Sequence, residues 1–211
     1  MSMNPNWLLK LKEFKAKDRR ETFGTAEFRF MSLLLAQDPE EQLPVSSTDV
    51  VEKVQSIFQD KKVIEVDYVK DNQKFYFGPF GLIVGARERV PLSIEWFLNV
   101  MESDKDIRDF AKACDKVMED SNLLNAAEQA LRLLSTNPLV PVVYTIAKQA
   151  MKQLCYLLRR NKDDQVAMFD ITAAKWCDYP YGDCVMDDVV DITGNGCLSA
   201  AMFTNPAIKE G

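Results

Sequence analysis

Residues 92–104 read LSIEWFLNVMESD and follow a proline, Pro91. Apolar side chains occupy every second position, namely Leu92, Ile94, Trp96, Leu98 and Val100. Ser93, Glu95 and Asn99 fall on the alternate face. A period of two is typical of a β-strand, whereas a helix would scatter the same apolar positions around its axis. Pro91 also suits the start of a strand. The sequence therefore predicts a strand here.

After Asp104 the apolar period changes to three and four, which predicts helices. The expected helices cover residues 105–118, 122–134 and 140–160, and together they make a helical block over 105–161. The apolar run 138–158 contains Lys148 and Lys152, which would be costly inside a bilayer. The sequence therefore predicts helices of a soluble protein and no transmembrane span.

Alternating or β-branched segments on both sides of this block predict further strands. They cover residues 25–37, 61–70, 74–84, 165–176 and 197–203, with a long loop over 177–196. The turn residues 71–73 favour a hairpin between the second and third of these strands. A short helix is expected to be capped by Ser47 or Thr48, with Glu52 closing a capping box.

Strands before and after a helical block predict an α+β fold. We expect an antiparallel β-sandwich with residues 105–161 inserted between strands, and with the N- and C-terminal strands paired. The length of 211 residues suits one domain over 1–211.

The N-terminal segment 6–20 predicts a helix, since its apolar residues follow helix-like spacing. These are Trp7, Leu8, Leu11 and Phe14, with lysines on the other face. Such a segment either packs on its own domain or contacts a membrane or a partner helix. A second aromatic group, Phe75, Tyr76, Phe77 and Phe80, is expected to supply core and cross-strand pairs.

Composition excludes several kinds of chemistry. The chain has no histidine, which excludes a Ser–His–Asp triad, a Cys–His dyad and an imidazole pH switch. Its five cysteines show no CxxC spacing, so we expect thiols in a reducing cytoplasm. The net charge is −6, although residues 1–20 hold six bases against two acids. An acidic body argues against a nucleic-acid partner.

The strongest functional signal is acidic. Five aspartates fall within fourteen residues of the expected late loop, namely Asp178, Asp183, Asp187, Asp188 and Asp191. No lysine or arginine lies between Lys175 and Lys209. Oxygen-rich loops suit Ca²⁺, which accepts six to eight oxygen ligands in irregular geometry. The alternative is a solvated acidic connection. Tyr179 and Tyr181 beside it are candidate contacts with a membrane or a partner.

A second acidic group follows the strand 92–101 and contains Glu102, Asp104 and Asp106. It departs from an EF-hand, because the sixth position lacks glycine and the twelfth, Asp115, is not glutamate. These acids are candidate metal ligands, or alternatively they stabilise the N-terminus of the following helix.

A sandwich strand ending in Glu102-Ser103-Asp104-Lys105-Asp106, with a second acidic loop at 178–191 between late strands, resembles a C2 domain. The likeness covers about a quarter of the chain, in the strand 92–101 with its loop and in residues 165–203. It implies that loop aspartates at one end of the sandwich bind Ca²⁺ and dock on acidic phospholipid. Many C2-like domains instead serve as protein-interaction modules. A helical block directly after Asp104 is foreign to ordinary members.

These observations lead to three hypotheses. The first is a non-enzymatic cytoplasmic binding module that engages a cation, a membrane surface or a protein partner through acidic loops. The second is a metal-assisted hydrolase using the loop 178–191. The third is a structural or effector protein that interacts through its helical block, either with another protein or as a homo-oligomer.

Overall fold

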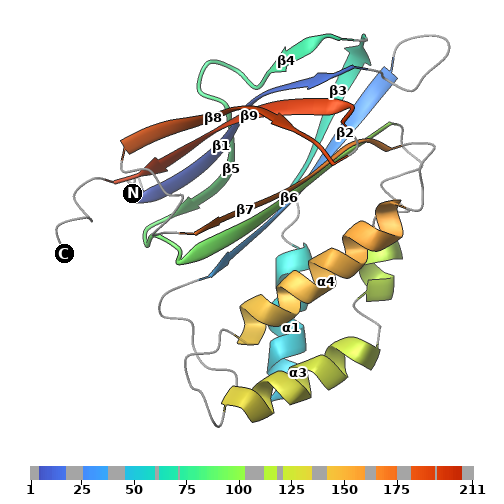
Figure 1. Ribbon diagram of the computed structural model, residues 1–211, viewed down its shortest axis with the longest axis vertical. Coiled ribbons are helices and arrows are strands. Elements are labelled where there is room, and N and C mark those ends of the chain that lie inside the picture. The colour runs from blue at the N-terminus through green and yellow to red at the C-terminus, as the bar shows by residue number, and fades with distance from the viewer. Residues whose placement is uncertain are drawn as a thin grey trace.

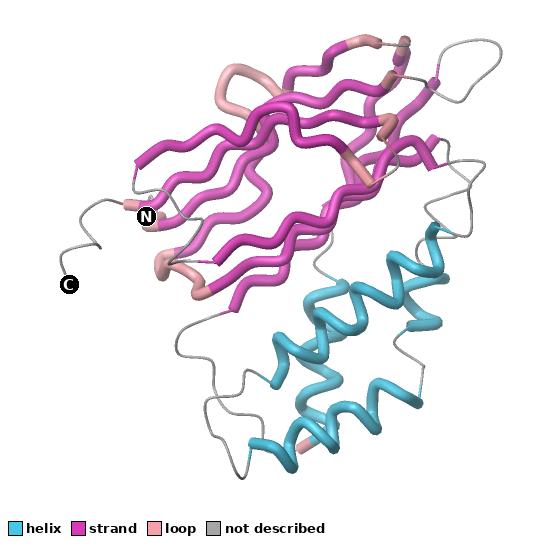
Figure 2. The backbone as a smooth tube through the Cα atoms, in the orientation of Figure 1, coloured by secondary structure: helices cyan, strands magenta, loops and turns pink. Residues whose placement is uncertain are grey.

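The computed structural model describes residues 5–17, 26–37, 46–59, 62–70, 72–102, 112–117, 121–134, 142–159, 165–174, 182–192 and 194–205. Figure 1 shows three layers, in which two β-sheets pack face to face and helices cover the far side of one of them. Figure 2 shows the same division, with all of the cyan helices on one side of the magenta strands. The structure is therefore of the α+β class with a sandwich-like arrangement of antiparallel sheets.

We call the first sheet the outer sheet. Its strand order is β4 (Lys74–Tyr76), β1 (Trp7–Ala16), β9 (Gly196–Thr204) and β8 (Gly182–Val190), and β5 (Leu82–Arg87) also pairs with β1. The central sheet has the order β3 (Lys62–Val69), β2 (Ala26–Gln37), β6 (Ser93–Glu102) and β7 (Gln165–Ala174). Every pairing in both sheets is antiparallel.

Strand β6 confirms the prediction made from its alternation. Trp96 and Leu98 lie in the core between the two sheets, whereas Phe97 and Met101 lie in the core between the central sheet and the helices. Every residue from Ile94 to Glu102 is buried, because both faces of this strand are covered. Burial of one large apolar side chain contributes roughly 1.5–3 kcal/mol, so this strand anchors both cores.

The helical layer contains α1 (Ser47–Gln59), α3 (Ser121–Leu134) and α4 (Val142–Arg159). α3 and α4 fall between β6 and β7 in the chain, which confirms these helices of the expected block; residues 112–117 add a further helical turn. α4 and α1 pack on the central sheet, and α3 packs against these two helices, through residues such as Val54, Leu123 and Leu154. Among the described helices, none is long and apolar enough to cross a bilayer.

The cap of α1 lies one residue earlier than expected. Ser46 Oγ accepts the Asp49 amide at 3.1 Å, and the Asp49 carboxylate accepts the Ser46 amide at 3.0 Å. This reciprocal pair is a capping box in which Asp49 takes the place expected for Glu52.

The prediction of an N-terminal helix is wrong, because residues 7–16 form β1. Trp7, Leu9 and Leu11 alternate into the core as in any strand. A β-bulge between Leu11 and Glu13 then shifts the register, so that Phe14 also points inward. The extra residue of the bulge converts a period of two into spacings that imitate a helix.

The predicted hairpin of residues 61–84 is also wrong. β3 pairs with β2 in the central sheet, whereas β4 pairs with β1 in the outer sheet. The chain crosses between the sheets at Asn72, which has a positive φ of 58° and donates its amide to Ala16 at 2.9 Å. The expected strand 74–84 is divided into β4 and β5.

The C-terminal part differs from the expectation in two ways. The strand that pairs with β9 is β1, along its whole length from Trp7 opposite Thr204 to Ala16 opposite Gly196, whereas the first strand expected from the sequence, β2, pairs with β3 and β6. The expected loop over 177–196 instead contains β8, which lies along β9. β8 carries an irregularity between Met186 and Val189, which places Asp187 and Asp188 at a break in the alternation.

Candidate functional site

The structure describes some of the predicted acidic residues, and it places those on different elements. Asp183, Asp187 and Asp188 belong to β8, and Asp187 is exposed. Asp178, Asp104 and Asp106 lie outside the described residues. Within the described part of the chain, no group of three or more acidic or cysteine side chains is placed to hold a metal ion.

Asp191 has a structural role. It is 5% exposed, and its two carboxylate oxygens accept the amides of Met168 at 3.1 Å and Gly196 at 2.7 Å. The neighbouring Ile192 amide donates to the Met168 carbonyl at 2.9 Å. Asp191 therefore ties the β8–β9 connection to β7 inside the fold and does not belong to an open acidic loop.

Glu102 is likewise buried, at 8% exposure, and lies opposite Phe28 at the end of β6. Its carboxylate therefore sits at the margin of the central sheet, and the acids expected to accompany it lie beyond the described residues. The metal role of this group stays a prediction.

The predicted contact residues of the N-terminal segment are mostly core residues. Trp7 and Leu11 are 0% and 1% exposed and pack between the sheets, so burial removes them from any contact surface. Leu8 is half-buried on the opposite face of β1. Tyr179 and Tyr181 lie outside the described residues.

The structure instead exposes an aromatic segment that the sequence assigned to the core. We call residues 74–81, which comprise β4 and its connection to β5, the aromatic turn. Phe75 and Phe77 face inward as expected, with ring centroids 6.2 Å from Phe28 and 5.3 Å from Phe30 respectively. Tyr76 and Phe80 are 69% and 78% exposed, so the prediction that they belong to the core is wrong.

The fold holds the aromatic turn against β1. The Phe77 amide donates to the Lys12 carbonyl at 3.0 Å, and the Gly81 amide donates to the Gly78 carbonyl at 3.3 Å. Gly81 has a φ of 72°, and a Cβ there would lie 2.8 Å from the Leu11 carbonyl oxygen. Only glycine fits this close approach. The sequence Gly78-Pro79-Phe80-Gly81 is typical of a tight turn, but it does not indicate which way Phe80 points.

One lysine beside the turn is paired with a carboxylate. Lys74 Nζ lies 2.5 Å from Glu13 Oε1, which also accepts the Ser199 hydroxyl at 3.1 Å. The hydrogen bond from Lys74 lowers the pKa of Glu13, against the opposing effect of burial. Lys74 Nζ also lies 5.9 Å from the centre of the Tyr76 ring, within reach of a cation–π contact. Tyr76 is thereby oriented while its ring remains exposed.

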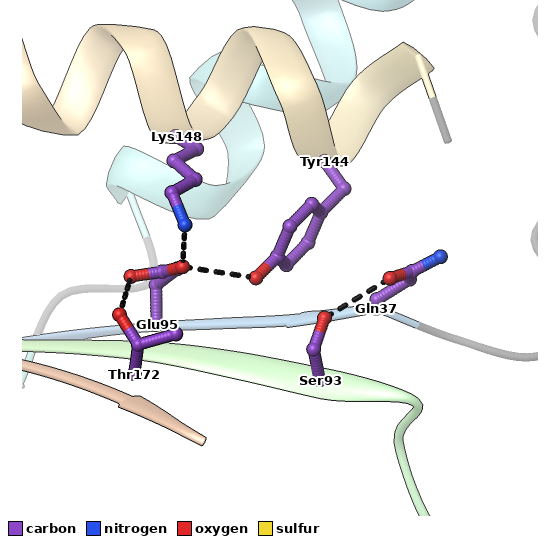
Figure 3. A network of polar contacts seen from close by, with 6 residues as sticks. All are labelled: Gln37, Ser93, Glu95, Tyr144, Lys148 and Thr172. Atoms are coloured by element: carbon purple, nitrogen blue, oxygen red, sulfur yellow. Dashed lines mark hydrogen bonds and ion pairs between the residues drawn. The ribbon is translucent and has the colours of Figure 1, made fainter. Parts of the chain in front are cut away.

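A separate polar network joins the helices to the central sheet (Figure 3). Glu95 Oε1 accepts hydrogen bonds from Lys148 and, at 3.2 Å, from the Tyr144 hydroxyl. Glu95 Oε2 accepts the Thr172 hydroxyl at 2.6 Å. Beside them, the Ser93 hydroxyl donates to Gln37 at 3.0 Å.

This network explains how a carboxylate is accommodated inside the fold. The hydrogen bond to Glu95 raises the pKa of Lys148, and burial raises the pKa of Tyr144. Three donors on β7 and α4 satisfy Glu95, which offsets the cost of burying its charge. The network therefore fixes α4 across β6 and β7.

A comparison of the chain with protein-family models and with curated proteins found no match.

Proposed function

We propose that the protein is a non-enzymatic binding module that holds a protein partner through its aromatic turn. The observation that carries this proposal is the exposure of Tyr76 and Phe80, at 69% and 78%, on a turn that β1 holds in place. Aromatic residues dominate the binding energy of protein interfaces when they enter a pocket on the partner. A turn that is already ordered loses little conformational entropy on binding.

The net charge favours a protein over an anionic membrane. Lys74, one of the cations beside the exposed rings, is paired with Glu13, and although Lys12 also lies next to Gly81, the chain as a whole carries a charge of −6. Attraction to anionic lipid requires several uncompensated basic residues near the surface. The partner is therefore expected to offer an apolar pocket for Phe80 and a hydrogen-bond acceptor for the Tyr76 hydroxyl.

The likeness to C2 domains stays part of this proposal. Two antiparallel sheets packed face to face support it, as do the acidic residues Asp183, Asp187 and Asp188 on β8. Calcium binding by these acidic residues is tested separately. If these acids bind Ca²⁺, millimolar Ca²⁺ raises the melting temperature, and D187N combined with D188N removes the rise. An equal rise in both proteins would contradict calcium binding at β8.

The partner surface is tested by site-specific photocrosslinking. A benzophenone amino acid replaces Phe80 in one protein and Tyr156, which is 64% exposed on α4, in another. We expect Phe80 to give a discrete protein adduct in cells that is lost when Tyr76 is changed to Ser. Adducts to lipid alone, or protein adducts only from Tyr156, would overturn the proposal; the latter would favour an interface on the helical layer.

The adduct is then identified and its affinity measured with purified components. Tyr76→Ser is expected to weaken binding by about tenfold or more, the scale of an interface hot spot. Ile192→Ser, at another exposed apolar residue, is the control and should leave the affinity unchanged.

A further inference from the structure

A second surface feature lies where the edges of the two sheets come together, at β3 and β5. β3 begins at Lys62, which pairs with Ser32, but β2 continues to Gln37. Among the described residues, the edge of β2 beyond Ser32 is therefore not paired with β3. The opening there is a cavity of about 460 Å³. Its described lining residues are Ser32, Leu34, Ser56, Ile57, Lys62, Ile83, Val84, Gly85, Ala86 and Arg87.

Lys62 is positioned by the edge of β5. Its ammonium donates to the carbonyls of Ile83 at 3.0 Å and Val84 at 2.9 Å. Successive carbonyls of a regular strand point in opposite directions, but β5 has a register shift opposite Leu9 and Lys10, which brings both within reach of one ammonium. An ammonium has three N–H donors, so the third is left for a ligand in the cavity.

Two further groups add hydrogen-bonding capacity. Ser32 is 5% exposed, and its Oγ accepts the Trp96 indole N–H at 2.9 Å, which leaves the hydroxyl proton to be donated. Arg87 is exposed, and its Nη1 donates to the Ala86 carbonyl at the long distance of 3.4 Å. Most of the guanidinium donors therefore face solvent at the cavity mouth.

The charge of the cavity opposes that of the molecule. Its described lining holds two cations and no carboxylate, although the chain carries −6 overall. Leu34, Ile57 and Val84 supply an apolar wall. A cavity of several hundred Å³ with a few convergent polar groups on apolar walls is the usual form of a small-ligand site.

We propose that this cavity binds a small organic anion that carries a short apolar chain. Its acidic group lies between the Lys62 ammonium and the Arg87 guanidinium, and its chain lies against Leu34 and Ile57. Arginine recognises carboxylates and phosphates by parallel N–H donors, so both acidic groups fit this chemistry. The site is independent of the aromatic turn, and its occupancy does not depend on the protein partner proposed above.

The test uses four probes with six carbon atoms each, namely hexanoate, hexyl phosphate, hexanol and hexylammonium. Each is titrated into ¹⁵N-labelled protein, and the amide shifts of Ser32, Gly85 and Ala86 are followed. We expect one or both anions to bind in the millimolar range or tighter, and hexylammonium to bind far more weakly. The two anionic probes distinguish a carboxylate ligand from a phosphate ester.

Variants locate the binding. Arg87→Gln is expected to lower the affinity for the anion by about tenfold or more. Arg89→Gln, at a second exposed arginine outside the cavity lining, should leave the affinity unchanged. Ser56→Trp places a bulky ring at the mouth from an exposed helix position and should abolish binding. Phe80→Ser should have no effect, which separates this site from the aromatic turn.

Three results would overturn the proposal. They are an absence of shifts with both anions, an equal response to hexanoate and hexylammonium, and equal affinity in Arg87→Gln and Arg89→Gln. Because Arg87 and Ser56 are exposed, unchanged melting temperatures verify that each variant remains folded.

Discussion

Lys148 on α4 donates a hydrogen bond to Glu95 on β6, and so joins the helical layer to a carboxylate that is 3% exposed. Lys148→Met is expected to lower the free energy of unfolding by about 1–2 kcal/mol, between the values for exposed and buried ion pairs. The loss arises because Glu95 stays buried with one donor fewer. Urea denaturation measures it, and Lys152→Met, at an exposed position of the same helix, is the control.

From the same pair of residues we predict that the stability of the protein depends on pH in the alkaline range. Folding raises the pKa of Lys148 above its ordinary value of 10.5, so its contribution is complete below that pH and is lost as pH rises through the folded-state pKa. The difference in stability between the native protein and Lys148→Met should therefore shrink above about pH 10.5. A difference that stays constant up to pH 12 would contradict this assignment.

For Glu13 we predict a stability contribution that is lost at acidic pH, the opposite direction to that of Lys148. Its pKa is lowered from 4.5, chiefly by the hydrogen bond from Lys74, so its contribution is present above pH 4.5 and is lost as pH falls through the folded-state pKa. Denaturation of Glu13→Gln and the native protein between pH 3 and pH 6 should show the two stabilities converging toward the acid end. In a Lys74→Gln background, the stability difference between Glu13 and Glu13→Gln should be mostly removed.

Asp191→Asn tests the structural role of that carboxylate. The amide keeps one acceptor oxygen but turns an NH₂ group toward a backbone N–H of Met168 or Gly196, so we expect a loss of about 2–4 kcal/mol. The matched variant Asp187→Asn changes an exposed carboxylate and should stay within about 0.5 kcal/mol. Equal effects of the two variants in urea denaturation would contradict the role assigned to Asp191.

Gly196→Ala tests the close approach of the two sheets. A Cβ at this position would lie 2.4 Å from Ala167 Cβ and 3.1 Å from the Phe14 ring. Ala167 has no rotamer by which to yield, so thermal unfolding should show a loss of about 1–3 kcal/mol or more. Gly85→Ala meets Leu34 Cδ2 at 2.2 Å, the end of a side chain that can rotate, and we expect a smaller loss.

Phe80→Ser separates binding from folding. Phe80 is 78% exposed, so its removal should change stability by no more than about 0.5 kcal/mol. Phe77→Ala, which removes the ring beside Phe30, should cost about 2 kcal/mol. Chemical denaturation compares the two, and a large loss in Phe80→Ser would show that this ring serves the fold.

Local periodicity is sufficient to predict a strand or helix where that element is regular. β6 alternates without interruption, and α3 and α4 keep a helical period, so each is visible in the sequence. The bulge after Leu11 disguised β1 as a helix, and the break near Asp187 with its acidic neighbours disguised β8 as a loop. A period cannot be recognised where one inserted residue shifts its phase.

The features that could not be predicted from the sequence depend on pairing between strands far apart in the chain. Residues 61–84 looked like a hairpin because the turn at Asn72 is local, whereas the true partners, β2 and β1, lie far away in the chain. The cavity depends on the register that sets Lys62 opposite Ser32, and no short motif contains that relationship. The exposure of Phe80 depends on the contact of Gly81 with β1, although the two glycines around it were visible.

The pairing of β1 with β9 has a consequence for biosynthesis. Trp7 lies opposite Thr204, so the outer sheet joins residues separated by almost the entire chain. Such a sheet cannot close on the ribosome until β9 has emerged, and contacts of this sequence separation slow folding. The central sheet requires nothing beyond β7, so it can be finished first, leaving the face with Phe28 and Phe30 without cover during translation. We therefore expect the nascent chain to depend on chaperones until β9 is added.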